Sequence, residues 1–250
     1  MGERVRELRL EWCMRGDSII VFLQRWNQWA NTACRAASIV WLSVDDGPRI
    51  KSENAWSESL RSCSENTIVD LSTRLGEGGF VTVLPSQYMV IQLCVAEIDQ
   101  WSDSQIQLYR EALRASTSWA PILFAYAYVV EGVIVENGKA YYDGRSEWVP
   151  NPAQQGVFYG LPAAPPWLTW YGPCYAPLID PPRGAVVEEL SGGLWVALSP
   201  NPMSRREIVA SFGVHNPDLR AVEYYDHPQD VGPSLRPATK APDGVVLGLV

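Results

Sequence analysis

Residues 119–142 read WAPILFAYAYVVEGVIVENGKAYY, and this stretch decides the predicted fold. Its first half is the most apolar run in the chain, but the run from Trp119 to Val130 has only 12 residues and contains Pro121. A membrane-spanning helix needs about 20 apolar residues. The run therefore predicts a buried strand over 122–130, which ends where Glu131 follows.

Two turn signals predict that neighbouring strands are antiparallel. Asn137-Gly138 is the strongest two-residue hairpin signal, because both positions require positive φ. Pro85-Ser86-Gln87 separates two further apolar segments and also predicts a hairpin. The strands predicted on either side of these turns are 132–136 with 139–142, and 80–84 with 88–95.

Towards the N-terminus the pattern predicts a strand, a helix and a second strand. Residues 4–12 alternate, with Leu8, Leu10 and Trp12 on one face, and 39–44 form a short apolar strand. Between them, apolar residues recur at spacings of three and four over 18–37, which is typical of an amphipathic helix. The predicted apolar positions of that helix are Ile19, Phe22, Leu23, Trp26, Trp29, Ala30, Ala33 and Cys34.

Two more helices are predicted by their capping signals. Ser102 is followed by Gln105, and Ser204 is followed by Glu207, which is the spacing of a capping box at a helix N-terminus. Strands are predicted over 167–171 and 193–198. Ser191-Gly192-Gly193 predicts a hairpin turn or a turn that leads into the second of these strands.

These elements predict an α+β fold with a mainly antiparallel sheet packed against two or more helices. Residues 1–250 are interpreted as a single α+β domain, and a subdivision near residue 150 stays open. Of the 19 prolines, 16 lie from Pro150 onward, so 150–250 is expected to hold short strands and turns. Residues 1–149 are free to form longer regular elements.

Composition and charge narrow the classes of function. The 250 residues are 47% hydrophobic and 19% charged, which excludes global disorder. The net charge of −8 argues against nucleic acid and against an anionic membrane surface as partners, since both need a basic face. It favours a basic protein as the partner. The oligomeric state stays open.

The cysteines and the N-terminus indicate the compartment. Five cysteines are scattered without any Cys-x-x-Cys pair, at Cys13, Cys34, Cys63, Cys94 and Cys174. Scattered cysteines are typical of small buried apolar residues in a reducing compartment, so we expect all five to be reduced and most to be buried. Charges interrupt the N-terminal residues, which does not fit a signal peptide. Cytoplasmic localisation is therefore expected.

No linear motif predicts a catalytic residue, a metal site or a cofactor. His215 and His227 are 12 residues apart in turn-like contexts, without the spacing of a zinc site. No serine lies in a Gly-x-Ser-x-Gly elbow, and no glycine-rich loop has the context of a phosphate loop. Glu188 and Glu189 are adjacent, so on a strand they point to opposite faces and do not form an acid–base dyad. Glu131 closes the most apolar strand; the favoured interpretation is a strand-end residue that reaches solvent, and a half-buried carboxylate with a raised pKa is the alternative.

The densest aromatic segment supplies the candidate partner-binding residues. Tryptophan and tyrosine commonly form hot spots when they lie at an interface, and a strand buried on both faces is the alternative interpretation. The candidate anchors, provided that they are exposed, are Trp167, Trp170, Tyr171 and Tyr175.

This segment also carries a resemblance to a known group of proteins. The pattern Trp167-x-Thr169-Trp170-Tyr171-Gly172-Pro173-x-Tyr175 is followed by Leu178-Ile179 and by the strand predicted at 193–198. Over roughly residues 160–200 the chain resembles bacterial immunity proteins of polymorphic toxin systems. The resemblance implies a cytoplasmic α+β protein without a cofactor that binds and neutralises a toxin domain. Many toxin domains act on nucleic acid and are basic, which fits the acidic charge.

Three hypotheses for the function follow. The first is a non-enzymatic binding protein, most simply an immunity protein. The second is an enzyme whose site is assembled in space from residues without a linear signature. The third is a structural or assembly protein of a bacterium or phage. A deep polar pocket that holds Glu131, His215 or His227 would favour the second, and a large symmetric interface would favour the third.

Overall fold

The computed structural model describes residues 2–33, 35, 38–44, 47–52, 55–56, 58–59, 67–73, 77–82, 88–96, 101–136, 139–142, 150, 152–154, 157–225 and 233–248. The predictions that concern Cys34, Cys63, His227, Asn137-Gly138 and Pro85-Ser86-Gln87 lie outside these residues, as does the side chain of Cys94.

The strands are β1 (Glu3–Arg15), β2 (Ile39–Val44), β3 (Thr67–Thr73), β4 (Glu77–Thr82), β5 (Tyr88–Ala96), β6 (Ile122–Glu136), β7 (Lys139–Tyr142), β8 (Ala153–Gln154), β9 (Val157–Phe158), β10 (Leu168–Tyr171), β11 (Val186–Leu190), β12 (Gly193–Ala197), β13 (Val222–Tyr224) and β14 (Ser234–Arg236). The α-helices are α1 (Ile19–Ala33), α3 (Asp103–Ser116) and α4 (Arg205–Phe212), and short 3₁₀ helices are η1 (Gly16–Ser18), η4 (Ala176–Leu178) and η5 (Pro217–Leu219).

A ten-stranded sheet forms the centre of the molecule, in the order β11-β12-β10-β6-β1-β5-β4-β3-β2, with β7 paired to β6. The strand pairs described in this sheet are antiparallel. The predicted α+β fold with a mainly antiparallel sheet is confirmed. Since β10 pairs with β6, the sheet runs continuously across residue 150.

The strands predicted on either side of the two turn signals are paired. Glu136 lies opposite Lys139 in the β6–β7 pair. In the β4–β5 pair, Phe80 lies opposite Ile91 and Glu77 lies opposite Cys94. Both pairs are antiparallel, as the sequence predicts for these apolar segments.

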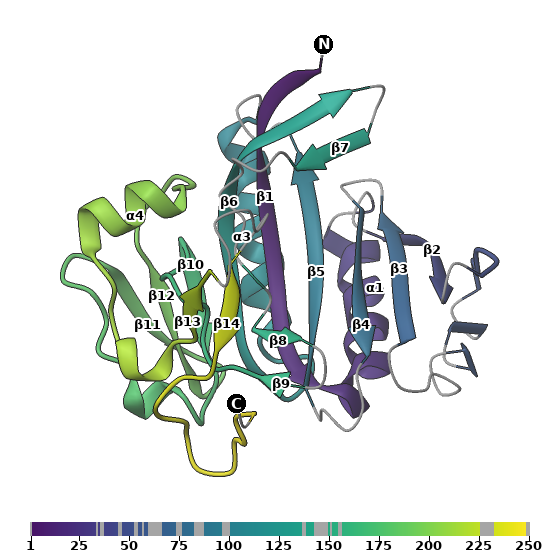
Figure 1. Ribbon diagram of the computed structural model, residues 1–250. Coiled ribbons are helices and arrows are strands. Elements are labelled where there is room, and N and C mark those ends of the chain that lie inside the picture. Colours follow the sequence, from purple (N-terminus) through teal and green to yellow (C-terminus); the bar gives the residue numbers. More distant parts are fainter. Residues whose placement is uncertain are drawn as a thin grey trace.

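Helices α1 and α3 cover one face of the sheet (Figure 1). Trp12 of β1 packs against Phe22 and Trp26 of α1, with ring centroids 5.5 and 5.4 Å apart. The Trp12 indole N–H donates to the Ser116 hydroxyl at the end of α3 (2.7 Å). In the part of the chain that is described, no helix combines the length and apolar character needed to cross a bilayer.

The predicted helix over 18–37 is shorter than expected, because α1 ends at Ala33. Phe22 and Trp26 are buried and Trp29 is half buried, as the pattern predicts. The prediction that Ala33 is buried is wrong, because residues 31–33 at the end of α1 are exposed. Asn27 is buried instead, and its side-chain oxygen accepts a hydrogen bond from the backbone N–H of Ile39 at the start of β2 (2.9 Å).

The capping signals identified in the sequence mark the starts of α3 and α4. The backbone N–H of Ser102 donates to the Gln105 side chain (2.9 Å). The backbone N–H of Ser204 donates to the Glu207 carboxylate (2.7 Å). Each contact satisfies a backbone donor at the helix start, which explains why these helices begin there.

The opposite face of the sheet is covered by segments from the second half of the chain. Phe124 of β6 packs against Phe158 of β9 and against Tyr175, with ring centroids 6.2 and 5.8 Å apart. The backbone N–H of Gly248 near the C-terminus donates to the Phe158 carbonyl (2.9 Å). Both faces of the central strands are therefore buried.

Candidate functional site

The four predicted aromatic anchors are core residues. Trp167, Trp170, Tyr171 and Tyr175 are each at most 4% exposed. Strand β10 lies between β6 and β12, and both of its faces are packed, so its side chains have no route to a partner. The indole N–H groups of Trp167 and Trp170 donate to the carbonyls of Ser199 (2.9 Å) and Leu190 (2.8 Å). The expected exposure of these residues is wrong, and the alternative interpretation of a strand buried on both faces holds.

The residues considered for catalysis do not form a described pocket. Glu131 and His215 are half buried, and neither lines the two hollows discussed below. The His215 ring contacts the Phe212 carbonyl, and the His215 carbonyl accepts from the Arg220 side chain (2.6 Å). These contacts are typical of a histidine that holds a turn in place.

Strand β1 carries a cluster of buried charged residues that the sequence patterns do not predict. Glu7, Arg9 and Glu11 alternate with Leu8, Leu10 and Trp12, and their exposed fractions are 2%, 3% and 0%. Alternating charges usually mark the solvent face of a strand. Here that face is covered as well, because residues distant in sequence pack over it.

The buried charges are held by hydrogen bonds from neighbouring strands. Arg9 forms an ion pair with Glu7 (2.6 Å). The Glu11 carboxylate accepts from the hydroxyls of Tyr126 and Tyr128 on β6 and from the Gln92 amide on β5. Such a set of donors satisfies a buried carboxylate and fixes the register of three adjacent strands.

Burial dominates the protonation behaviour of Glu11. It raises the pKa of this carboxyl group, although hydrogen bonds from Tyr126 and Gln92 act in the opposite direction. Burial and the adjacent Glu11 charge also raise the pKa values of Tyr126 and Tyr128 well above their ordinary range. Since Glu11 is fully enclosed, we interpret the cluster as part of the structural core.

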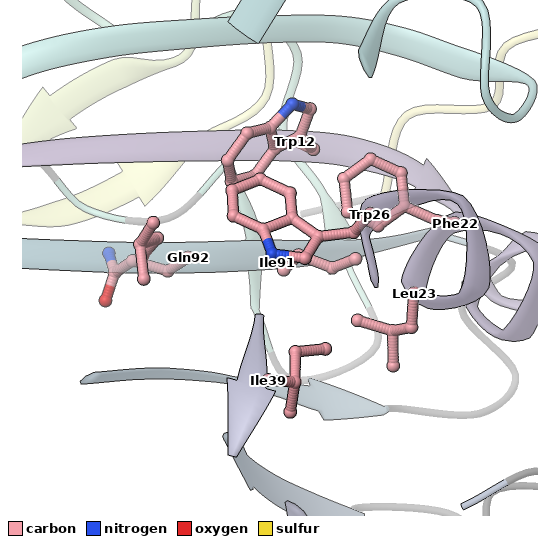
Figure 2. A pocket seen from close by; sticks show the side chains of 8 residues that line it. Trp12, Phe22, Leu23, Trp26, Ile39, Ile91 and Gln92 are labelled. Atoms are coloured by element: carbon pink, nitrogen blue, oxygen red, sulfur yellow. The ribbon is translucent and has the colours of Figure 1, made fainter. Parts of the chain in front are cut away.

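The hollow beside Trp12 is small and mostly apolar (Figure 2). Its volume is about 10 Å³, and Gln92 is the one polar residue in its lining. That volume is about the smallest that admits a single water molecule, so this hollow does not bind a ligand. The lining residues are Trp12, Phe22, Leu23, Trp26, Ile39, Ile91, Gln92 and Leu93.

Among the strands of the large sheet whose side chains the structure describes, the edge strand β11 is the most exposed. Val186 is 65% exposed and Val187 is 44% exposed, and Glu188 and Glu189 are also exposed. Because β11 is last in the strand order, it pairs with β12 on one side only. We call these four residues the β11 surface. It combines apolar side chains, carboxylates and an open sheet edge, the features from which strand-binding sites are made.

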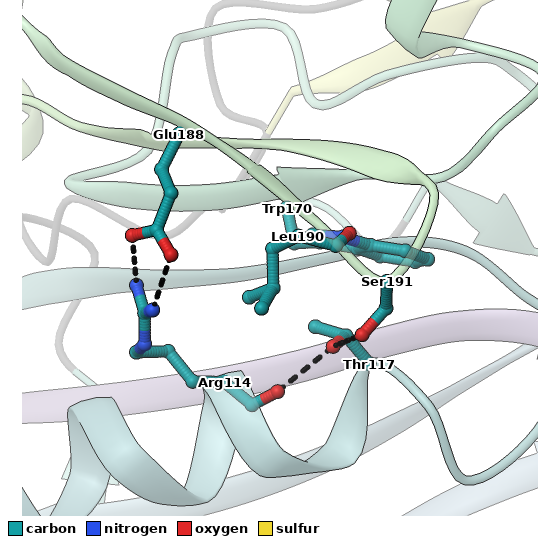
Figure 3. A network of polar contacts seen from close by, with 6 residues as sticks. All are labelled: Arg114, Thr117, Trp170, Glu188, Leu190 and Ser191. Carbon is teal, nitrogen blue, oxygen red and sulfur yellow. Dashed lines mark hydrogen bonds and ion pairs between the residues drawn. The ribbon is translucent and has the colours of Figure 1, made fainter.

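The β11 surface is fixed to the body of the molecule by α3 (Figure 3). Arg114 makes two hydrogen bonds to the Glu188 carboxylate (3.0 and 2.8 Å), and its guanidinium lies 5.1 Å from the centre of the Trp195 ring. The hydrogen bonds from Arg114 lower the pKa of Glu188. Thr117 contacts the Ser191 hydroxyl (3.0 Å) at the turn between β11 and β12.

A hollow of about 560 Å³ lies beside this surface, on the face that Glu189 shares. Its other lining residues come from η4 and from the β11–β12 turn, and they are Ala176, Pro177, Leu190, Ser191, Gly192, Gly193 and Leu194. Glu188 and Glu189 thus have different surroundings, as expected for adjacent strand residues. Glu188 is held by α3, whereas Glu189 faces the hollow.

The described residues show neither a metal site nor a reactive thiol. Among the described residues, no group of three or more His, Cys, Asp and Glu side chains is placed to hold a metal ion. Cys13 is buried and Cys174 is half buried, and both are free thiols. Burial raises the pKa of both thiols, so neither has the environment of a reactive cysteine.

Comparison with known proteins identifies a distant structural neighbour. No protein-family model matches the chain, and no curated protein matches its sequence. The fold is similar to that of the Pseudomonas aeruginosa T6SS protein PA0821, with a TM-score of 0.53 and 10% sequence identity. The match covers 87% of this chain and 74% of that chain. At this identity the similarity concerns the fold alone.

Proposed function

We propose that this chain is a non-enzymatic binding protein of the T6SS immunity type, which binds and neutralises a basic toxin domain in the cytoplasm. The observation that carries the proposal is the β11 surface, Val186 to Glu189, an exposed, acidic and partly apolar sheet edge beside a hollow. The partner is a protein, without participation of nucleic acid, membrane or cofactor.

The rigidity of the β11 surface supports a role in binding. The bonds from Arg114 to Glu188 and from Thr117 to Ser191 hold the edge before any partner arrives. A surface ordered in advance loses less conformational entropy when it binds. The exposed valines Val186 and Val187 supply apolar area that a partner can desolvate, which is the main source of affinity at interfaces.

Charge supports a basic partner. The chain carries a net charge of −8, and the exposed carboxylate of Glu189 on β11 has no ion-pair partner among the described residues. Complementary charge raises the rate of encounter with a basic domain and disfavours acidic competitors. Toxin domains that act on nucleic acid need basic surfaces, which makes them a matching class of partner.

The structural neighbour supports a role associated with a T6SS. PA0821 is described as a T6SS protein, and T6SS-associated proteins include immunity proteins. The match covers 87% of this chain, so the fold similarity spans both of its halves. Sequence resemblance and fold similarity thus favour the same class of function.

The proposal is tested with the protein encoded beside this chain. An immunity protein is expected to have a neighbouring gene for a large secreted protein with a basic C-terminal domain. We expect that domain to bind the purified chain in calorimetry and to lose its toxicity when the two are co-expressed. Neutralisation should require equimolar chain, since binding is stoichiometric. A neighbourhood without such a gene, absence of binding, or neutralisation by a small fraction of an equivalent contradicts the proposal.

Charge reversal tests whether the β11 surface is the site. Glu189→Lys is expected to weaken binding at least tenfold. Glu3→Lys makes the same change of charge at an exposed position at the far end of β1 and serves as the matched control. Equal effects of the two substitutions would show that net charge alone matters, and would place the site elsewhere.

A further inference from the structure

We infer that the partner binds by adding an extended strand to the open edge of β11, with a basic side chain beside Glu189. The inference rests on the proposed function, because it specifies how the same surface is recognised. Its basis is the arrangement of the backbone along β11, which leaves hydrogen-bonding groups directed away from the sheet.

The turn between β11 and β12 defines which backbone groups are directed outward. Ser191 and Gly192 both have positive φ, 51° and 74°, which identifies a two-residue turn. The residues that flank such a turn, Leu190 and Gly193, form a hydrogen-bonded pair, and this pattern repeats at every second residue. The N–H and C=O groups of Glu188 and Leu190 therefore face β12, and those of Val187 and Glu189 face outward.

The opposite edge of the sheet is protected, which makes β11 distinctive. At β2 the backbone N–H and C=O of Leu42 both bond to Ile50 (2.9 and 2.7 Å). Arg49 in the same segment lies over the Trp41 ring, 4.5 Å from its centre. A covered edge is the usual way in which a sheet avoids unwanted strand pairing. In the described part of the chain, β11 has no such cover.

Charge disfavours a second copy of this chain as the occupant. In the antiparallel register that pairs Val187 with Glu189 of the copy, Glu188 lies opposite the same residue of the copy. Like charges directly opposite each other destabilise a strand pair. A basic strand reverses this effect. Among the described residues Glu189 has no ion-pair partner, so its carboxylate is available to a lysine or arginine of the incoming strand.

The position of the hollow indicates on which face of β11 the basic side chain of the partner lies. Glu189 lines the hollow of about 560 Å³, together with Leu194 and Pro177. Because side chains alternate along a strand, Val187 lies on the same face as Glu189, whereas Glu188 lies on the α3 face with Arg114. A partner strand is thus expected to place its basic residue over the hollow and an apolar residue beside Val187.

The inference is tested by removing one outward N–H group. The probe is the basic C-terminal domain of the neighbouring secreted protein defined above. Val187→Pro removes the outward N–H at a position where an edge strand tolerates proline. Val187→Ala keeps that N–H and shortens the side chain, and is the matched control. We expect Val187→Pro to weaken binding at least tenfold and Val187→Ala to weaken it less than threefold.

Hydrogen exchange of the unmodified chain gives an independent readout that does not depend on whether the proline variant folds. On binding, the amides of Val187 and Glu189 are expected to exchange more slowly, whereas those of Glu188 and Leu190, which already bond to β12, should change little. Unchanged exchange at Val187 and Glu189, or equal binding by both Val187 variants, overturns strand addition. If Glu189→Lys still weakens binding in that case, the proposed function stands. Absence of binding by the unmodified chain overturns both.

Discussion

Burial and hydrogen bonding act in opposite directions on the Glu11 carboxyl group. Complete burial raises its pKa above the ordinary value of 4.5, and the donors from Tyr126 and Gln92 reduce that rise without cancelling it. The folded protein therefore holds a proton at Glu11 more tightly than the unfolded chain does. It follows that ionisation of this group opposes folding.

The pH dependence of stability is predicted from this shift. As the pH rises from 4.5 through the pKa in the folded state, the unfolded chain loses the proton first, so the Glu11 contribution to the free energy of unfolding falls. Glu11→Gln removes the titrating group and keeps the size of the side chain. Urea unfolding between about pH 4.5 and 8 should show a smaller fall in stability for Glu11→Gln than for the unmodified chain. Parallel curves for the two proteins would refute the prediction.

Gly192 is the second residue whose conformation has a measurable consequence. Its φ is +74°, and a Cβ atom added there would meet only Pro173, at 3.8 Å, so space is available but the backbone conformation is unfavourable. Gly192→Ala is expected to reduce the free energy of unfolding by about 1–2 kcal/mol, because L-residues disfavour this region. Denaturant titration checks the value. A neutral effect would show that the turn relaxes without cost.

At the scale of elements, α1 shows a clear division between buried and exposed positions. Trp26 is 5% exposed and contacts the rings of Trp12 and Trp119, whereas Val21 on the same helix is 47% exposed. Trp26→Ala is expected to destabilise the fold by about 3–5 kcal/mol through lost apolar contacts and the cavity that remains. Val21→Ala, the matched control, should change stability by no more than about 0.5 kcal/mol. Similar melting curves for both variants would show that α1 does not pack as described.

The elements that sequence patterns predict well are those with local signals. The periodicity around Phe22 and Trp26, the capping residues Ser102 and Ser204, and the apolar run of β6 depend on neighbours within a few positions. Strand β11 is different: its turn at Ser191-Gly192 is visible in the sequence, but the strand itself is not predicted. Its exposed residues lack the alternation that burial of one face imposes on most strands.

The candidate site was harder to predict than the fold, because burial depends on the order of strands in the sheet. The aromatic pattern of β10, including Trp170 and Tyr171, suits an interface and a core equally well. Only its position between β6 and β12 shows that it belongs to the core. The same reasoning applies to Glu7 and Glu11, which alternate as solvent-facing residues do but are covered by distant segments.

At the scale of the whole molecule, the two sheet edges have different properties. One edge, β2, is paired locally to Ile50, and the other, β11, is open and acidic. The net charge of −8 attracts a basic protein before the two surfaces touch, in addition to the local attraction by the carboxylates of β11. Binding of a basic partner should therefore depend on ionic strength mainly through the association rate.

Raising the salt concentration from about 0.05 to 0.5 M is expected to slow association with the basic toxin domain at least about tenfold, because the Debye length falls from more than about 10 Å to only a few Å. Stopped-flow or surface-binding kinetics measure this rate separately from dissociation, which should change less. Glu189→Lys should flatten the dependence on salt more than Glu3→Lys does, since Glu189 lies on the proposed interface and Glu3 lies at the far end of β1. An association rate indifferent to salt would contradict binding of a basic partner through an acidic surface, and would favour an enzyme or a structural protein as the function of this chain.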